Sequence, residues 1–544
     1  MKRLLALAAL ALLLPSTAAP QALPNLSSVR VRYSTQKATV RPEGELKAKI
    51  DELDRQIAEA SRLGHIGELR RLYAKGIALL AGREWNDAAD FANSLVIRSE
   101  RVVVDSTRPY AVRLEQIYTP AIQLDRSLGA HATLRKRGAQ GAQGAQGAQG
   151  AQGAQGAQGA QGAQGAQGAP GAQGASEVVK DLGTIDGVSR DLRESPAMFE
   201  LDLQGVPDGG YQLTIDVTDG TRALGGASLA IAVRKGLDDL VSRLEADAKH
   251  APEALRADIL FPIDRMRNVN RGRLELRTFD PDQDFADAEA IAAAVRAGKN
   301  PFAARTGDFK RHYALESAGE IMPYRLYVPT RYTAGAQGAA FPLIVALHGL
   351  GGTEDSFFTG YDSVTPKLAE QHGYIVAAPL GYRVDGSYGW GLGNPPADPN
   401  TRRLQERSEE DVMQVLQLVR QQYRIDENRI YLAGHSMGGI GTWKIAPKFP
   451  DIWAAIAPFA GSGTPATLER IRHIPEFVVH GDDDRTVNVQ GSRSMVEQAK
   501  ALGIEVTYVE VPGGSHSGVV APNLPGMFDF FNAHKKSGRA TSQP

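Results

Sequence analysis

The chain has 544 residues and not one of them is cysteine. This absence excludes disulfide bonds, cysteine-ligated metal sites, thiol nucleophiles and a lipid anchor on cysteine. Any covalent catalysis must therefore use another side chain.

A surplus of positive charge and long apolar runs are also missing. The formal net charge is −1, so we expect neither a nucleic-acid partner nor an anionic membrane surface. The apolar run Leu4–Leu14 is shorter than the roughly 20 residues that cross a bilayer. Because a basic start precedes this run and small residues follow it, we interpret residues 1–22 as a secretory signal peptide cleaved after Ala18 or Ala22. We expect a secreted or periplasmic protein without an integral membrane segment after signal removal.

The hydrophobic pattern changes several times along the chain and predicts a multidomain protein. Leu46, Ile50, Leu53, Ile57 and Ala60 recur at helical spacing, and the next region alternates with a period of two between turn residues. We predict a signal peptide, a helical hairpin, an immunoglobulin-like β-sandwich, a helical linker region, an α/β catalytic domain and a disordered tail, at residues 1–22, 23–95, 96–235, 236–304, 305–537 and 538–544.

A glycine repeat interrupts the predicted sandwich. Residues 138–176 form thirteen consecutive Gly-x-y triplets, nearly all Gly-Ala-Gln. Glycine at every third position suggests collagen, but a triple helix relies on abundant proline and the repeat contains only Pro170. We therefore interpret it as a solvated low-complexity insert in a loop between strands, where a long insertion costs little. Accordingly, we expect a monomer.

Near-continuous apolar strands alternate with helical segments in residues 305–537. This pattern predicts a mostly parallel sheet covered by helices on both faces. Such a sheet carries its chemistry at the carboxyl ends of its strands.

The strongest motif follows one of these strands. Ile430–Ala433 leads into Gly434-His435-Ser436-Met437-Gly438 and then into a helical stretch. Strand, G-x-S-x-G and helix in this order predict that Ser436 is a nucleophile exposed on a sharp turn. Glycine on either side is expected because a Cβ there would collide with the strand or the helix.

A serine nucleophile needs a base and a carboxylate that orients the base. His516 follows the last apolar strand and a glycine turn, and the H-G-x-x-D spacing from His480 selects Asp484. Asp482 and Asp483 are then turn residues, with direct substitution for Asp484 as the alternative. No further ligand spacing accompanies the three aspartates, so we expect no metal and no cofactor. The chain order serine, aspartate, histidine is the one expected of this arrangement.

The turn after Leu343–Leu347 is rich in glycine and ends in Gly351-Gly352. Backbone N–H groups there could approach a developing oxyanion, and one such donor is worth about 2.7–4 kcal/mol. We predict the N–H groups of Leu350 and Met437 as the two donors, with Gly349 or Gly351 as alternatives to Leu350. A phosphate-binding loop would require a GK[ST] ending, which this turn lacks.

These motifs resemble secreted bacterial esterases of the α/β-hydrolase superfamily. The resemblance covers about 230 residues and includes the feruloyl and acetylxylan esterases, polyhydroxybutyrate depolymerases, and relatives of the prolyl-oligopeptidase and dienelactone-hydrolase types. It rests on His348–Gly352, Ser408–Val412, Asp426–Tyr431, Gly434–Gly439, His480–Asp484 and Gly513–His516.

The resemblance implies an α/β-hydrolase fold, a Ser–His–Asp triad of Ser436, His516 and Asp484, and hydrolysis of a small-molecule or polymer-linked carboxylic ester. Two departures from the family patterns narrow the range of activities that the resemblance implies. Dienelactone hydrolases use cysteine, which this chain lacks. The depolymerase pattern often continues with Trp-Pro after its histidine, whereas Ser517-Gly518-Val519 follows here.

Substrate selection is less specified by the sequence. Trp390 and Tyr361 lie in loops beside the predicted site, and we predict them as pocket residues, with simple loop packing as the alternative. Two other function classes stay open. One is a serine peptidase of the prolyl-oligopeptidase type, and the other is a non-catalytic binding protein with a vestigial hydrolase domain.

Overall fold

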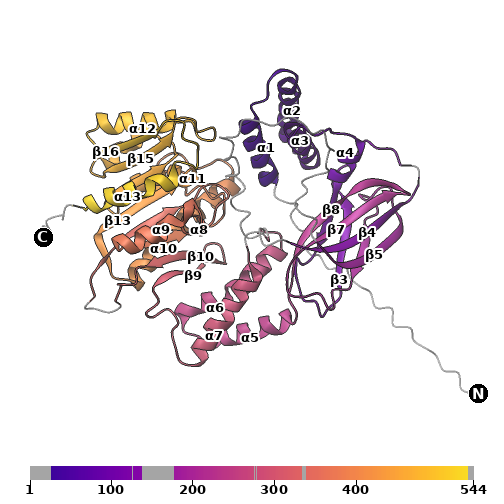
Figure 1. The fold of residues 1–544 in the computed structure, drawn as a ribbon, viewed down its shortest axis with the longest axis horizontal. Coiled ribbons are helices and arrows are strands. Elements are labelled where there is room, and N and C mark those ends of the chain that lie inside the picture. Colours follow the sequence, from indigo (N-terminus) through magenta and orange to yellow (C-terminus); the bar gives the residue numbers. More distant parts are fainter. Residues whose placement is uncertain are drawn as a thin grey trace, which may run out of the picture.

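The structure is a computed structural model and describes residues 26–124, 126–137, 177–274, 276, 279–333 and 338–536. The predicted signal peptide, the Gly-Ala-Gln insert and the predicted C-terminal tail from 538 onward lie outside these residues. Among the described residues, no helix combines the length and the apolar character needed to cross a membrane. The chain runs from N-terminal helices through two β-sheets and a second group of helices to a large C-terminal α/β unit (Figure 1).

The N-terminal helices differ from the predicted hairpin. Three helices share a small core of Tyr33, Ile50, Tyr73 and their neighbours, and the short fourth helix packs instead against a strand of the following sheets. The first helix was not expected, because its sequence has no apolar periodicity. The buried face of the second helix is the predicted one. The four helices are α1 (Leu26–Val40), α2 (Gly44–Arg62), α3 (Ile66–Leu80) and α4 (Asp87–Ser94).

Two β-sheets follow, and we call them together the two-sheet unit. One has three antiparallel strands in the order β1-β3-β6 and the other five strands in the order β2-β8-β7-β4-β5. The strands are β1 (Leu95–Ser99), β2 (Val103–Val104), β3 (Tyr110–Gln116), β4 (Leu128–Lys136), β5 (Val178–Val188), β6 (Ala197–Leu201), β7 (Gly209–Asp219) and β8 (Arg222–Val233). β4 and β5 flank the Gly-Ala-Gln insert and pair antiparallel, so the insert connects two neighbouring strands.

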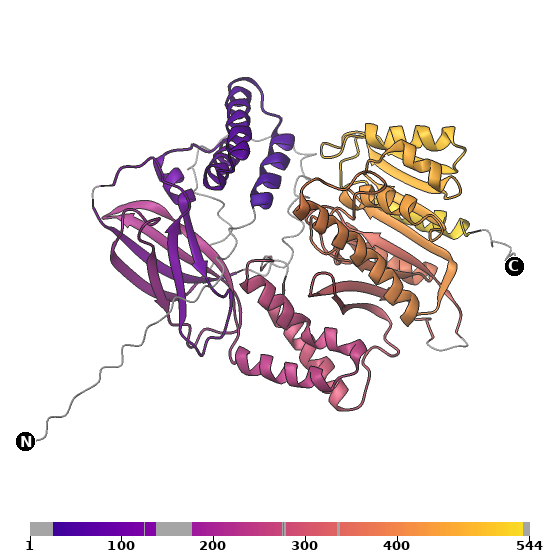
Figure 2. The ribbon, with the colours of Figure 1, turned by 180° about the vertical axis from the view of Figure 1, so that it is seen from behind.

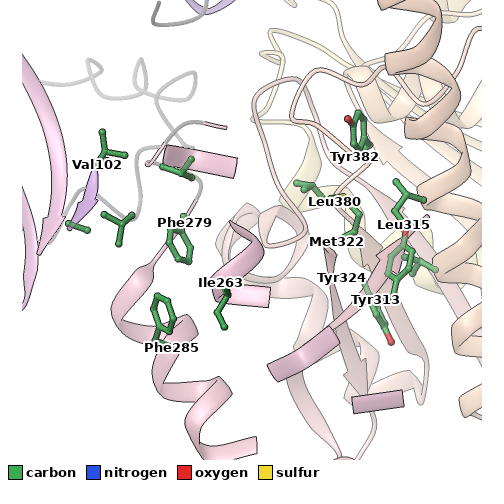
Figure 3. Packing of buried hydrophobic residues seen from close by; sticks show 14 of the residues in the cluster. Val102, Ile263, Phe279, Phe285, Tyr313, Leu315, Met322, Tyr324, Leu380 and Tyr382 are labelled. Carbon is green, nitrogen blue, oxygen red and sulfur yellow. The ribbon is translucent and has the colours of Figure 1, made fainter. Parts of the chain in front are cut away.

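The segment expected as a helical linker region contains three packed helices. These are α5 (Leu237–His250), α6 (Glu253–Asn270) and α7 (Pro281–Arg296). Their buried residues, among them Ile263 and Phe285, belong to a core that continues from the two-sheet unit into the C-terminal unit. Figure 3 shows these two residues between Val102 of the two-sheet unit and Tyr313 of the C-terminal unit. The segment therefore joins its neighbours through a buried interface.

The C-terminal unit is built on one eight-stranded sheet. Its strand order is β16-β15-β14-β13-β11-β12-β10-β9, with parallel pairing from β16 to β12 and antiparallel pairing at β10 and β9. The strands are β9 (Gly307–Leu315), β10 (Glu320–Val328), β11 (Phe341–Leu347), β12 (Ile375–Pro379), β13 (Ile425–His435), β14 (Ala455–Phe459), β15 (Glu476–Gly481) and β16 (Val506–Val511).

Helices cover both faces of this sheet, as the continuous apolar strands predict. Along β11, Leu343, Val345 and Leu347 face one core cluster, and Ile344 and Ala346 face the other. The first cluster lies under α10 (Pro399–Gln422), α11 (Met437–Lys448) and α12 (Gln490–Ala501), and the second under α8 (Ser356–Thr359), α9 (Val364–His372) and α13 (Val520–Ala533). Figure 2 shows the sheet enclosed between these helices.

Candidate active site

Ser436 lies between the end of β13 and the first residue of α11, on the turn that its motif predicts. Its backbone has φ 57° and ψ −116°, a strained conformation for a residue with a Cβ. A Cβ on Gly434 would collide with the carbonyl of Gly438, and one on Gly438 would collide with the carbonyl oxygen of Leu347. The close packing of strand, turn and helix therefore requires both glycines.

Three predicted site residues meet at this turn. The Oγ of Ser436 lies 2.8 Å from Nε2 of His516, and Nδ1 of His516 lies 2.6 Å from Oδ2 of Asp484. Ser436 is 8% exposed, while the side chain of Asp484 is fully buried. With its Nδ1 proton directed at the carboxylate, the neutral imidazole has its Nε2 lone pair free to accept the serine proton.

Asp484 is held by more donors than His516 alone. Its Oδ1 accepts the backbone N–H groups of Thr486 (2.8 Å) and Val487 (2.9 Å), and its Oδ2 also lies 3.1 Å from Nε2 of His480. Burial opposes ionisation of Asp484, but the hydrogen bonds from His480 and His516 outweigh it and keep its pKa below the usual range. The carboxylate is therefore both ionised and fixed in orientation.

The neighbouring aspartates have other roles. Asp482 accepts the backbone N–H of Gly513, and Asp483 pairs with Arg485 at the surface. Both therefore act as turn residues, as the H-G-x-x-D spacing predicts. Within the described ranges, no group of three or more histidine and carboxylate side chains is arranged to hold a metal ion.

A second histidine supports the loop of His516. Burial lowers the pKa of His435 to about 3, so its ring is neutral near pH 7. Its Nε2 lies 3.0 Å from the backbone carbonyl of His516 and must therefore carry the proton that it donates. Nδ1 is then an acceptor, and the hydroxyl of Tyr361 donates to it across 2.8 Å. Tyr361 and His435 thus form a buried chain that ends on the backbone of His516.

The segment that begins at Tyr361 is strained. Tyr361, Asp362 and Ser363 have φ values of 48°, 58° and 51°, a left-handed conformation that costs roughly 1–2 kcal/mol per non-glycine residue. The surrounding structure must compensate for this cost, and the packing of Tyr361 against Phe357 and His435 contributes to that. Tyr361, expected as a pocket residue, is 9% exposed and its hydroxyl points to His435.

The glycine-rich turn after β11 narrows the choice of oxyanion donors. The N–H of Gly351 donates to the carbonyl of Val384, and the N–H of Gly352 donates to that of Gly349. Gly351 is therefore excluded as an alternative to Leu350. The side chain of Leu350 is 48% exposed, and a Cβ on Gly349 would lie 3.3 Å from the Cβ of Ser436. The turn and the nucleophile are thus in close contact.

Trp390 contacts a lysine of α11. Its ring is 5.3 Å from the ammonium of Lys448, the last residue of α11. Ser436 directly precedes the other end of this helix, about 18 Å from Lys448 along the helix axis at 1.5 Å per residue. The contact with Lys448 fits the alternative of loop packing, and the pocket role of Trp390 stays a prediction.

Sequence reasoning missed several supporting residues. His435 and His480 lie inside the quoted motifs but received no role, although a histidine beside a nucleophile is a usable signal. Tyr388 is fully buried, and its hydroxyl donates to the backbone carbonyl of His348 at the start of the glycine turn. No local pattern marks Tyr388, because the contact joins loops 40 residues apart.

The strand order, the strained serine turn and the Ser–His–Asp hydrogen bonds together define the α/β-hydrolase class. Residues 316–520 match the model of a family described as "Putative esterase". This part of the chain is an esterase-family domain.

Curated relatives are similar to the same part of the chain. A bifunctional acetylxylan esterase/xylanase of Neocallimastix patriciarum is 28% identical over 34% of this chain and 24% of its own length. Feruloyl esterase B of Neurospora crassa is 30% identical over 22% of this chain and 38% of its own. The chain thus spans well under half of these two relatives.

A solved structure and a second family model are also similar to parts of this chain. A solved ferulic acid esterase of Anaeromyces mucronatus aligns with a TM-score of 0.34 and 19% identity, covering 42% of this chain and 90% of that one. Residues 129–178 match the collagen triple helix repeat, in line with glycine at every third position of the insert. The two ends of that match lie in the paired strands β4 and β5.

Proposed function

We propose that this chain is a serine esterase that cleaves carboxylic esters through an acyl-enzyme intermediate. One observation carries the proposal: Ser436, His516 and Asp484 form a continuous hydrogen-bonded relay on a strained turn of an esterase-family domain. The names of the relatives, which include feruloyl and acetylxylan esterases, support an ester as the substrate.

In the acylation step, Oγ of Ser436 attacks the ester carbonyl carbon while Nε2 of His516 takes its proton. Asp484 stabilises the imidazolium that forms. The carbonyl oxygen becomes an oxyanion, for which we assign the N–H groups of Leu350 and Met437 as donors. His516 then gives its proton to the leaving alcohol, and the C–O bond of the ester breaks.

In the second step, water replaces the alcohol. His516 removes a proton from the water as it attacks the acyl carbon, and the proton passes to Oγ of Ser436 when the acid leaves. We propose a small-molecule or polymer-linked ester as substrate, a secreted or periplasmic location and a monomeric state.

The test combines labelling with kinetics. A fluorophosphonate probe should label the wild type and a Ser494→Ala control, which changes a serine of α12, but not Ser436→Ala. On p-nitrophenyl acetate and a feruloyl ester, Ser436→Ala should lose about 10⁴–10⁶ in kcat. Equal labelling of Ser436→Ala and wild type would reject the proposal. Faster turnover of an aminoacyl p-nitroanilide than of either ester would favour a peptidase.

A further inference from the structure

His480 is a fully buried histidine near the end of β15, next to the carboxylate of the relay. Its Nε2 lies 3.1 Å from Oδ2 of Asp484 and 3.0 Å from the backbone carbonyl oxygen of Val487. Both neighbours are acceptors, because Asp484 is ionised and a carbonyl oxygen carries no proton. Nε2 of His480 must therefore carry a proton, and this N–H group is shared between the carboxylate and the carbonyl.

Oδ2 of Asp484 is thus an acceptor for two imidazoles. Nδ1 of His516 lies 2.6 Å from it and Nε2 of His480 lies 3.1 Å from it. The other oxygen, Oδ1, accepts the backbone N–H groups of Thr486 and Val487. With donors on both oxygens, the carboxylate is held in its orientation toward His516. The N–H of His480 also stabilises negative charge on Oδ2 that would otherwise act on His516 alone.

The second nitrogen of the His480 ring connects to the helix that follows the nucleophile. Nδ1 lies 2.7 Å from Oγ of Ser492 on α12, which lies beside β15 (Figure 1), and the same Oγ lies 3.1 Å from the carbonyl oxygen of Gly461. A Cβ on Gly461 would lie 2.8 Å from the carbonyl carbon of Gly439, the third residue of α11. Contacts therefore run from His480 through α12 back to the start of α11.

The other titratable groups around His480 already have partners or are uncharged. Glu510 stands opposite His480 in the pairing of β15 with β16, and its carboxylate is bound by Arg493 of α12 and by the hydroxyl of Tyr508. His435 is neutral near pH 7. Among the described residues, the carboxylate of the relay is therefore the one on which the N–H of His480 acts.

We propose that His480 is a positioning residue of the relay, which holds the carboxylate of Asp484 toward His516 and limits the negative charge that this carboxylate directs at the imidazole. This role rests on the proposed esterase function and adds control of its pH range. Without the N–H of His480, the carboxylate would stabilise the imidazolium form of His516 more strongly. His516 would then be protonated, and unable to act as a base, at higher pH. The acid limb of activity, the pH region in which kcat/KM falls as the base is protonated, therefore moves to higher pH.

Two amide variants separate the contact with Asp484 from the contact with Ser492. The amide nitrogen of glutamine is two bonds beyond Cγ, as Nε2 of histidine is, so His480→Gln keeps a donor within reach of Asp484. The amide nitrogen and oxygen of asparagine are one bond beyond Cγ, as Nδ1 of histidine is. His480→Asn therefore keeps the contact with Ser492 and loses the contact with Asp484.

The experiment measures kcat/KM for p-nitrophenyl acetate from about pH 5 to about pH 9. His480→Asn should move the acid limb to higher pH by about half a unit and lower kcat/KM on its plateau about tenfold. His480→Gln should keep the acid limb within about 0.2 unit of the wild-type position, because it keeps the donor to Asp484. The matched control is His473→Asn, which changes an exposed histidine and should alter neither quantity.

A ring without nitrogen provides a second variant. His480→Phe fills the space of the imidazole without an N–H group, so it should move the acid limb in the same direction as His480→Asn, and thermal unfolding establishes which variants are folded. An acid limb at the wild-type position in folded His480→Asn or His480→Phe would overturn the proposal, as would equal shifts in His480→Asn and His480→Gln. Absence of p-nitrophenyl acetate hydrolysis by the wild type would instead contradict the esterase proposal.

Discussion

Replacing Asp484 with asparagine, a side chain of nearly the same size, should inactivate the hydrogen-bonded relay of Ser436, His516 and Asp484. The two backbone N–H groups of Thr486 and Val487 already point at one carboxylate oxygen. The single oxygen of asparagine will therefore stay with them, because the reverse orientation would place an NH₂ group against two donors. The NH₂ group then faces His516 and His480 and donates to Nδ1 of His516. His516 must in turn carry its proton on Nε2, where it cannot accept the proton of the nucleophile.

The expected loss is about 10⁴-fold in kcat, which corresponds to roughly 5.4 kcal/mol of transition-state stabilisation. Steady-state hydrolysis of p-nitrophenyl acetate at pH 7 measures it. The matched control is Asp483→Asn. The carboxylate of Asp483 pairs with Arg485 at the surface, so this substitution should change kcat less than twofold. If Asp484→Asn kept more than a tenth of the wild-type kcat, the assignment of Asp484 as the orienting acid would be wrong.

Four other changes have defined outcomes. Tyr361→Phe should lower kcat about three- to tenfold at unchanged KM, because it removes the donor to His435, whereas Tyr374→Phe, whose hydroxyl bonds elsewhere, should change neither. His435→Gln should reduce the decrease in the free energy of unfolding at acid pH, as measured by urea unfolding. In the unfolded chain His435 binds a proton below about pH 6.5, whereas in the folded protein it does so only near pH 3. Between these two pH values, His435 therefore lowers the free energy of unfolding by roughly 1.4 kcal/mol for each unit by which the pH falls. Deleting residues 138–174 should leave esterase activity and elution volume unchanged, and a change from trimer to monomer would support the collagen interpretation instead. Trp390→Ala should keep kcat/KM for acetyl and feruloyl esters within about twofold of the wild-type value. A selective rise in KM for the feruloyl ester would instead support Trp390 as a pocket residue.

The most predictable features of this protein are local. The turn at Ser436 follows from its two glycines, because a Cβ on Gly434 would collide with the backbone of Gly438 and a Cβ on Gly438 with the backbone of Leu347 in the neighbouring strand. The chain order of Ser436, Asp484 and His516 and their positions after β13, β15 and β16 follow from apolar strands that end in turn residues. Parallel strands carry such residues to the same edge of a sheet, so pattern alone predicted their proximity. The α/β architecture is likewise encoded in strands that are apolar on both faces.

The supporting contacts depended on the course of the loops. Tyr361 was expected beside the substrate, but the fold turns its hydroxyl to His435, 74 positions along the chain. Trp390 was expected to be a pocket residue, and only the tertiary structure places its ring against Lys448 at the end of α11. The predicted linker became packed helices that share a core with both neighbouring units. Periodicity and motifs report on neighbours within a strand or a helical turn. Contacts between distant loops depend on how the whole chain packs, and for that reason only the tertiary structure decided them.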